Sequence, residues 1–188
     1  MATGPLTKDA EIQKLRGQME TLAGQLAAAE ARLREMGIAD PITGLFSYRY
    51  FLGRITEEVA RADRFGLEIS CLFVALDTPS FEGLLEVARS MRDACRQYDI
   101  PARWGQHELA MLLPATDVDG AMTFAERLRI GVANAFSSHP ALPKLTISAG
   151  IATYPRDGVE DAQQLLEAAS VALNHAREAG GNRTVLRP

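Results

Sequence analysis

The chain has 188 residues and a formal net charge of −4, with 47% hydrophobic and 23% charged residues. This length fits one domain with an appended element, and the composition is typical of a soluble globular protein. The acidic balance excludes a general nucleic-acid-binding surface, and no apolar run is long enough to span a bilayer. Because the first residues also lack the apolar core of a secretion signal, we expect a cytoplasmic protein that binds neither nucleic acid nor membrane.

Cys71 and Cys95 have no CxxC spacing and no ligand cluster nearby, so we expect free thiols.

An unbroken heptad pattern occupies residues 11–36. Its apolar positions alternate three and four residues apart, which on an α-helix makes one narrow stripe. A helix that lies on its own domain usually has a broader stripe, so we predict that residues 1–38 form a coiled coil that pairs two copies of the chain. Few charges occupy the e and g positions, so the orientation of the pair is poorly specified. The a and d residues are Ile12, Leu15, Met19, Leu22, Leu26, Ala29, Leu33 and Met36.

The sequence from residue 39 to residue 188 alternates between helical and extended patterns. The run Ile69–Leu76 is apolar nearly throughout, which is typical of a strand buried on both faces. Residues 105–107 join two short strands in a hairpin with polar turn chemistry. The central order βαββαβ predicts an α+β domain with a ferredoxin-like antiparallel sheet and helices on one face. We expect helices at 48–64, 82–97, 118–132 (capped by Asp117) and 161–179, and strands at 69–76, 101–104, 109–113, 145–153 and 185–186.

Short motifs occur in a fixed order along residues 39–188. Residues 40–45 read Asp-Pro-Ile-Thr-Gly-Leu, and residues 103–109 read Arg-Trp-Gly-Gln-His-Glu-Leu. Further motifs lie at 125–129, 146–152, 168–176 and 180–185. Together they resemble the D-x-L-T-G-L, R-Y-G-G-D/E-E-F and later motifs of the GGDEF family of bacterial diguanylate cyclases. The resemblance implies a palm fold of the nucleotidyl-cyclase type, and a dimer whose two half-sites join two GTP molecules into cyclic di-GMP by metal-assisted phosphoryl transfer.

The signature departs from the family, which predicts the loss of catalysis. The resemblance makes Asp77 a metal-binding aspartate and Glu108 the signature glutamate. Gly105 is kept, but Gln106 replaces a glycine and would fill space that the triphosphate needs. His107 replaces an acidic residue and is a poor ligand for Mg²⁺. His107 could instead form a different metal site with Asp77, although a solvated hairpin residue is the favoured interpretation.

Two further departures from the family also predict the loss of catalysis. The family's guanine-reading stretch after Phe81 is missing, because Glu82 is followed at once by Gly83-Leu84. Arg177 replaces a phosphate-contacting lysine, which keeps the charge but changes its geometry. We therefore expect a pseudo-diguanylate cyclase with no intact catalytic residue, no metal and no cofactor. An active cyclase with a rewritten pocket ranks last.

One other family motif is intact. Arg96-Gln97-Tyr98-Asp99 matches the R-x-x-D product-binding site, and Arg127 lies where the family has a second arginine for that site. In the family the arginine fork holds phosphate and guanine, and the aspartate accepts from a guanine edge. Because Arg96 and Asp99 are three apart at the end of a predicted helix, we expect their side chains on one face. The resemblance thus implies a dimeric cyclic di-GMP receptor. The alternative is a scaffold that dimerises and binds an unidentified protein partner but no nucleotide, with Arg96 and Asp99 as a solvated local pair.

Overall fold

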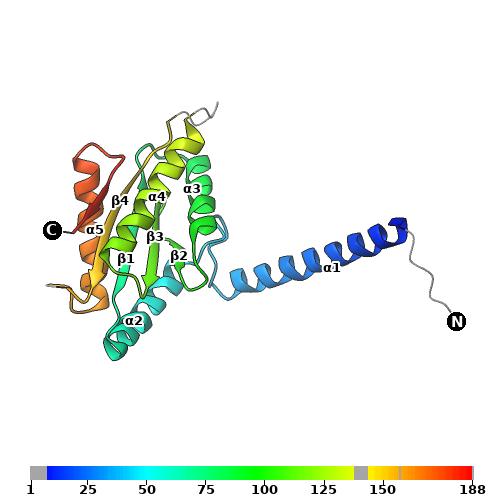
Figure 1. Cartoon of the computed structure of the whole chain (residues 1–188), viewed down its shortest axis with the longest axis horizontal. Helices are drawn as coiled ribbons and strands as arrows, with labels where there is room; N and C mark the ends of the chain where they lie inside the picture. The colour runs from blue at the N-terminus through cyan, green and yellow to red at the C-terminus, as the bar shows by residue number, and fades with distance from the viewer. Residues whose placement is uncertain (1–7, 138–143, 157, 188) are drawn as a thin grey trace.

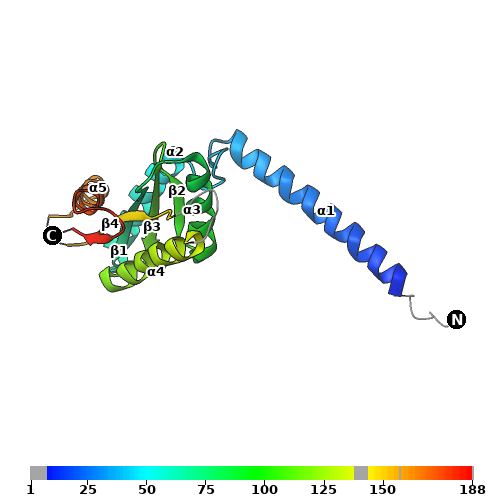
Figure 2. The ribbon, with the colours of Figure 1, turned by 90° about the horizontal axis from the view of Figure 1, so that it is seen from above.

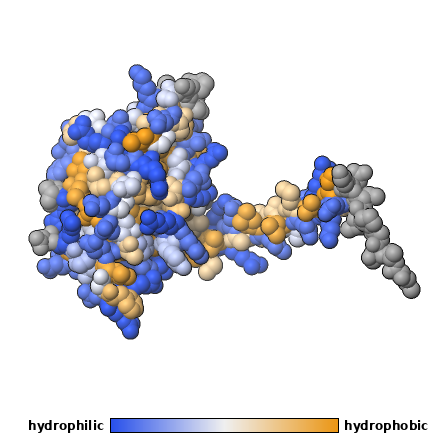
Figure 3. Space-filling view, in the orientation of Figure 1, coloured by the Kyte–Doolittle hydropathy of each residue, from blue (hydrophilic) through white to orange (hydrophobic). Residues whose placement is uncertain are grey.

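The computed structural model describes residues 8–137, 144–156 and 158–187. One helix, α1 (Lys8–Glu35), projects away from an α/β body that holds the other elements (Figures 1 and 2). The predicted N-terminal helix is confirmed. Its side chains from Ala10 onward are all exposed, including the apolar ones that lie along it in Figure 3. No helix of the described residues is long and apolar enough to cross a membrane.

A five-stranded sheet with the strand order β2-β3-β1-β4-β5 forms the middle of the body. All neighbouring strands run antiparallel except β4 and β5, which are parallel. The predicted βαββαβ core is therefore confirmed, with β5 added at one edge. The strands are β1 (Ile69–Leu76), β2 (Ile100–Arg103), β3 (Glu108–Pro114), β4 (Ile147–Tyr154) and β5 (Thr184–Leu186).

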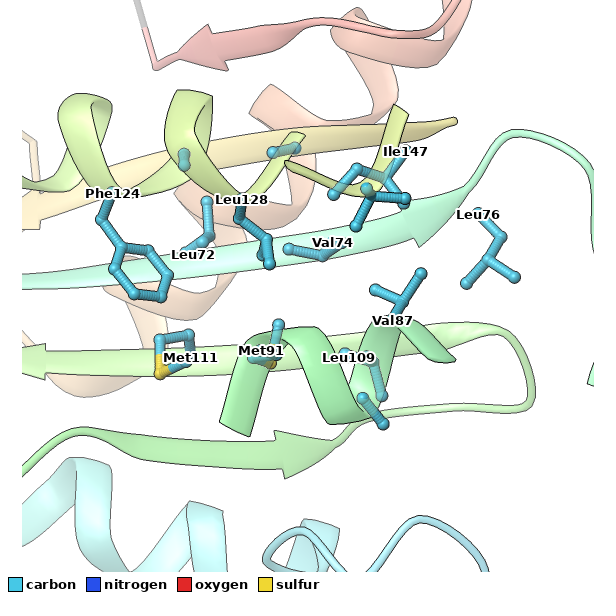
Figure 4. Close-up of a cluster of buried hydrophobic side chains, with 14 of the residues drawn as sticks. Leu72, Val74, Leu76, Val87, Met91, Leu109, Met111, Phe124, Leu128 and Ile147 are labelled. Atoms are coloured by element: carbon cyan, nitrogen blue, oxygen red, sulfur yellow. The ribbon is translucent and has the colours of Figure 1, made fainter. Parts of the chain in front are cut away.

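Helices cover both faces of this sheet: the two helices of the βαββαβ order lie together on one face, as predicted, and two further helices cover the other face. On β1, Leu72 and Val74 face one cluster of buried side chains, shown in Figure 4, while Cys71 and Phe73 face another. Because both alternating sets of β1 residues are apolar, each face needs a cover. The helices α3 (Phe81–Ala94) and α4 (Val118–Phe136) cover the first face, and α2 (Tyr48–Phe65) and α5 (Ala162–Glu178) cover the second.

Several elements begin or end at residues that differ from the prediction, and the helix α4 runs on to Phe136, beyond the expected end at residue 132. The helix α3 stops at Ala94 instead of residue 97, because Cys95 adopts an extended conformation (φ −68°, ψ 144°). The strand β4 begins at Ile147 instead of residue 145. The helix cap at Asp117 is confirmed. Both cysteines are free thiols, as predicted, and burial raises the pKa of Cys95 to about 12.

A compact loop at residues 38–47, which we call the joint loop, connects α1 to the body. The Oδ1 atom of Asp40 accepts from the backbone N–H and the hydroxyl of Thr43, each at 2.8 Å, and Oδ2 lies 3.4 Å from the guanidinium of Arg103 on β2. Arg92 on α3 donates to the carbonyl oxygen of Thr43, and the loop backbone pairs with the edge of β2. The joint loop is thus bonded to a helix and to a strand, so α1 ends on a fixed support.

We predict that Asp40→Ala lowers the free energy of unfolding of the body by about 1–2 kcal/mol, because it leaves the buried backbone N–H of Thr43 without its acceptor. Urea denaturation followed by circular dichroism measures this. Asp93→Ala is the control, since Asp93 is an exposed residue of α3 and should change stability by less than about 0.5 kcal/mol. Equal stability of the two variants would show that Asp40 does not hold the joint loop.

Candidate functional site

The first candidate site lies at the end of β1, beside the turn of the β2–β3 hairpin and the end of α5. It consists of Asp77, residues 105–108 and Arg177, and we call it the signature edge. Asp77 follows β1 directly, and its carboxylate is bonded within the protein. The Thr146 hydroxyl donates to Oδ2 at 2.6 Å, the Ser148 hydroxyl donates to Oδ1, and the backbone N–H of Asn182 donates to Oδ2 at 2.9 Å. A cation at Asp77 would have to compete with these three donors.

Glu108, the first residue of β3, is also paired. Its Oε1 lies 2.8 Å from a guanidinium nitrogen of Arg177, in the last turn of α5. The backbone N–H groups of Trp104 and Gly105 both donate to the Glu108 carbonyl oxygen at 3.0 Å, which closes the hairpin. Gln106 is exposed at its tip. Both carboxylates of the signature edge therefore have protein partners.

His107 is half-buried beside this hairpin, and its Nδ1 is a buried atom without a hydrogen-bond partner in the described part of the chain. A metal site would need further ligands close by. Within residues 8–137, 144–156 and 158–187, no three His, Cys, Asp or Glu side chains gather in a way that could hold a metal ion. The structure thus offers no ligand set around His107 and Asp77.

The connection from β1 to α3 is short and tightly packed. It consists of residues 77–80, and Ser80 caps α3 by accepting from the backbone N–H of Gly83 at 2.9 Å. A Cβ atom on Gly83 would come within 2.5 Å of the Ser80 hydroxyl and 2.9 Å of the Leu76 side chain. The first turn of α3 therefore packs directly against the end of β1.

The second candidate site brings together the three residues predicted to bind a nucleotide. Arg96, Asp99 and Arg127 line one pocket of about 250 Å³, which we call the Arg96 pocket. The expectation that Arg96 and Asp99 share a helix face was wrong, because α3 ends at Ala94 and residues 96–99 form a turn. The turn is closed by Asp99 itself, whose Oδ2 accepts from the backbone N–H of Arg96 at 2.7 Å.

Charge is unevenly distributed in the Arg96 pocket. Asp99 is only 7% exposed, and burial raises the pKa of its carboxyl, opposed by the backbone N–H of Arg96 and by the charges of Arg96 and Arg127. Arg127 reaches the Ala94 carbonyl oxygen at 3.4 Å and stacks over the Phe124 ring at 5.6 Å. Neither arginine forms an ion pair with any residue that the structure describes. Both guanidinium groups are exposed and can bind an anion.

Six residues that the sequence analysis did not predict also line this pocket: Leu113, Thr116, Asp119, Gly120, Thr123 and Phe124. Phe124 could have been found, because it precedes Arg127 by three residues on a predicted helix and such residues are neighbours. Asp119 adds a carboxylate that opposes anion binding, and no motif indicates it. The pocket is therefore less basic than its two arginines alone suggest.

Known proteins resemble this chain in sequence. The family described as Diguanylate cyclase, GGDEF domain, matches residues 82–183. The chain is 32% identical over 166 residues to diguanylate cyclase DgcP of Pseudomonas aeruginosa, covering 80% of this chain and 24% of DgcP. It is 30% identical over 169 residues to diguanylate cyclase DgcM of Escherichia coli, covering 83% of this chain and 40% of DgcM. The chain thus spans less than half the length of either relative.

Solved structures share the fold. The GGDEF domain of DgcB from Caulobacter crescentus, in complex with c-di-GMP, matches with a TM-score of 0.74 at 22% identity, over 80% of this chain and 93% of that one. The coiled coil and GGDEF domain of DgcB match with a TM-score of 0.73 at 21% identity, over 96% and 100%. Diguanylate cyclase SiaD of Pseudomonas aeruginosa, in complex with its activator SiaC, matches with a TM-score of 0.72 at 26% identity, over 94% and 72%. The α+β fold with its N-terminal helix and the family match agree: the chain belongs to the GGDEF family.

Proposed function

We propose that this chain is a catalytically inactive GGDEF protein that dimerises through α1 and binds cyclic di-GMP in the Arg96 pocket. Residues 1–38 form its dimerising part and residues 39–188 its GGDEF domain, and the protein acts in cytoplasmic signalling. The observation that carries the proposal is the convergence of Arg96, Asp99 and Arg127 on one pocket, with both guanidinium groups free of ion pairs among the described residues. The complex of DgcB with c-di-GMP supports the choice of ligand.

The signature edge supports the loss of catalysis. Phosphoryl transfer needs carboxylates that are free to hold metal ions and backbone that can approach the phosphates. Here Glu108 is ion-paired with Arg177, and the Asp77 carboxylate accepts three hydrogen bonds from the protein. Gln106 adds a side chain to the hairpin. The short connection at residues 77–80 provides no loop that could read guanine.

Because curated relatives are diguanylate cyclases, inactivity needs a direct test. We expect no cyclic di-GMP when the protein is incubated with GTP and either Mg²⁺ or Mn²⁺, measured by chromatography and mass spectrometry. A relative with an intact signature serves as the positive control. Turnover that disappears in Asp77→Ala or Glu108→Ala would contradict the proposal and would favour a cyclase with a rewritten pocket.

The Arg96 pocket supports a receptor because it combines the groups that a cyclic dinucleotide requires. Two guanidinium forks can bind phosphate and guanine oxygens, and the Asp99 carboxylate can accept from a guanine edge. The turn that carries Arg96 and Asp99 is fixed by its own hydrogen bond at 2.7 Å, so little conformational entropy is lost when a ligand binds. Asp119 is the opposing charge, and it lowers the expected affinity for an anion.

We predict that calorimetry detects cyclic di-GMP binding to the wild-type chain and that Arg96→Ala weakens it by about 2 kcal/mol or more, since hydrogen bonds to charged groups are lost. Asp99→Ala should weaken binding less, and added salt should weaken it further. The matched control is Arg89→Ala, an arginine whose side chain is 73% exposed on α3 outside the pocket. Glu108→Ala, at the signature edge, should also leave binding unchanged. If the wild-type chain gives neither heat nor chemical-shift changes with excess ligand, the receptor proposal fails.

The exposed stripe of α1 supports dimerisation. Its a and d side chains are 42–72% exposed at the seven large apolar positions, from Ile12 to Met36. Such a row is unusual on a monomer, and pairing with a second copy would bury it as one continuous seam. The charge pattern at e and g leaves the orientation open.

We predict that Leu22→Glu combined with Leu26→Glu shifts the chain from dimer to monomer, because burying each leucine in the seam contributes about 2 kcal/mol and a buried carboxylate is unfavourable. Light scattering over a range of concentrations measures the mass. Thr21→Glu with Ala28→Glu is the matched control, since it adds the same charge to α1 outside the seam. Deleting residues 1–36 should also shift the chain from dimer to monomer. A wild-type chain that is monomeric at micromolar concentration would contradict this assignment.

A scaffold that binds an unidentified protein and no nucleotide is the second candidate. The exposed seam of α1 favours it, as does the solved complex of SiaD with its activator SiaC. The two candidates differ in one measurement. A dimer that gives no calorimetric response to cyclic di-GMP would leave the scaffold as the function of this chain.

A further inference from the structure

A second cavity lies behind the turn that carries Arg96 and Asp99, on the side covered by α2. We call it the α2 pocket. It measures about 380 Å³, within the range of about 300–1,000 Å³ usual for small-molecule sites. Tyr50, Leu67, Ile100 and Pro114 give it apolar walls, and Arg54 and Arg61 add positive charge. The walls come from α2, from β2 and from the end of β3, so packing of the body fixes their positions.

The charged groups of the α2 pocket are arranged around one buried carboxylate. Glu58 is 3% exposed and pairs with both Arg54 and Arg61, the latter at 3.1 Å. Arg54 also reaches the exposed Glu57 at 3.2 Å, yet its Nε is a buried atom without a hydrogen-bond partner among the described residues. Arg61 is 56% exposed, so its outer nitrogens can take another acceptor. Because the two guanidinium groups share one buried carboxylate, some of their N–H groups have no acceptor within the pocket.

Two further observations concern the rim of the α2 pocket. Asp99 also lines it, but this carboxylate already accepts from the backbone of Arg96 and lies near the charges of Arg96 and Arg127. Ala115, at the edge of the cavity, has a φ of +48°, a left-handed conformation that is uncommon for a residue other than glycine. Strained backbone of this kind is concentrated at binding sites, and here it carries the chain past the opening of the cavity.

We propose that the α2 pocket binds a small organic carboxylate with an apolar body, such as a medium-chain or aryl carboxylate. Its apolar body packs on Leu67, Ile100 and Pro114, and its carboxylate accepts from Arg61 and Arg54. The site is separate from the proposed nucleotide site, although an occupant would contact the turn that closes the Arg96 pocket. The N–H groups that the two arginines have left after pairing with Glu57 and Glu58 favour an anionic group, and the walls favour an apolar remainder.

Decanoate is the probe, with decylammonium as the probe of opposite charge and equal length. Methyl chemical shifts of the full chain should show saturable changes at Leu67 and Ile100 with decanoate and none with decylammonium. Leu67→Asp should weaken decanoate binding at least about tenfold. Phe65→Asp is the matched control: Phe65 is the exposed last residue of α2, two residues before Leu67, and does not line the pocket. Leu67→Trp, which fills the cavity without adding charge, should weaken binding as well.

Several results would overturn the proposal. One is the absence of shifts at Leu67 and Ile100; another is shifts confined to the leucines of α1, which would indicate binding to its exposed stripe. Equal binding of decylammonium would show that the arginines do not select the ligand. An equal loss of decanoate affinity in Phe65→Asp would show that the cavity is not the binding site. Because none of these measurements uses cyclic di-GMP, their outcome is independent of the receptor proposal.

Discussion

Both faces of β1 are apolar, and burying them is the constraint on which the arrangement of the body depends. The strand pairs with β3 and β4 along its length, and two pairs of helices cover its faces. The signature edge lies at the C-terminal end of β1, next to Leu76, whereas the Arg96 pocket adjoins its first residue, because Ile69 pairs with Pro114 near that pocket. At about 3.3 Å per residue, the two sites lie roughly 20–25 Å apart along one strand. Loss of chemistry at one of them therefore need not disturb the other.

Much of the fold was predictable because it is encoded locally. The periodicity of residues 11–36 and the apolar run Ile69–Leu76 fix α1 and β1 without reference to distant parts of the chain. The βαββαβ order predicts that its own two helices share one face, and the apolar residues on both sides of β1 indicate that the opposite face needs a cover as well. The end of α3 was misplaced for a different reason. The apolar spacing continues through Cys95, and the extended conformation of that residue has no strong signal in the sequence.

The partners of the site residues were less predictable than the residues themselves. The resemblance indicated Asp77 and Glu108, but the groups that occupy them, Thr146, Ser148 and Arg177, lie about 70 residues away in the chain. The hydrogen bonds to Asp77 depend on the register of β1 against β4, and the Glu108–Arg177 pair depends on where α5 ends against the sheet; no local pattern gives either. The pocket around Glu58 was missed for a related reason. A glutamate between two arginines on α2 resembles ordinary solvated charges until packing against β2 and β3 buries it.

The exposure of α1 has a thermodynamic consequence. From Ala10 onward the helix buries no side chain in its own chain and so receives no tertiary support there. Isolated helices depend on propensity alone, to which Gly17 and Gly24 contribute unfavourably. If pairing supplies the missing stabilisation, helix formation in this segment and association of two chains are one equilibrium governed by mass action. The helical content of α1 then becomes a function of protein concentration, whereas the body is held by buried clusters of its own.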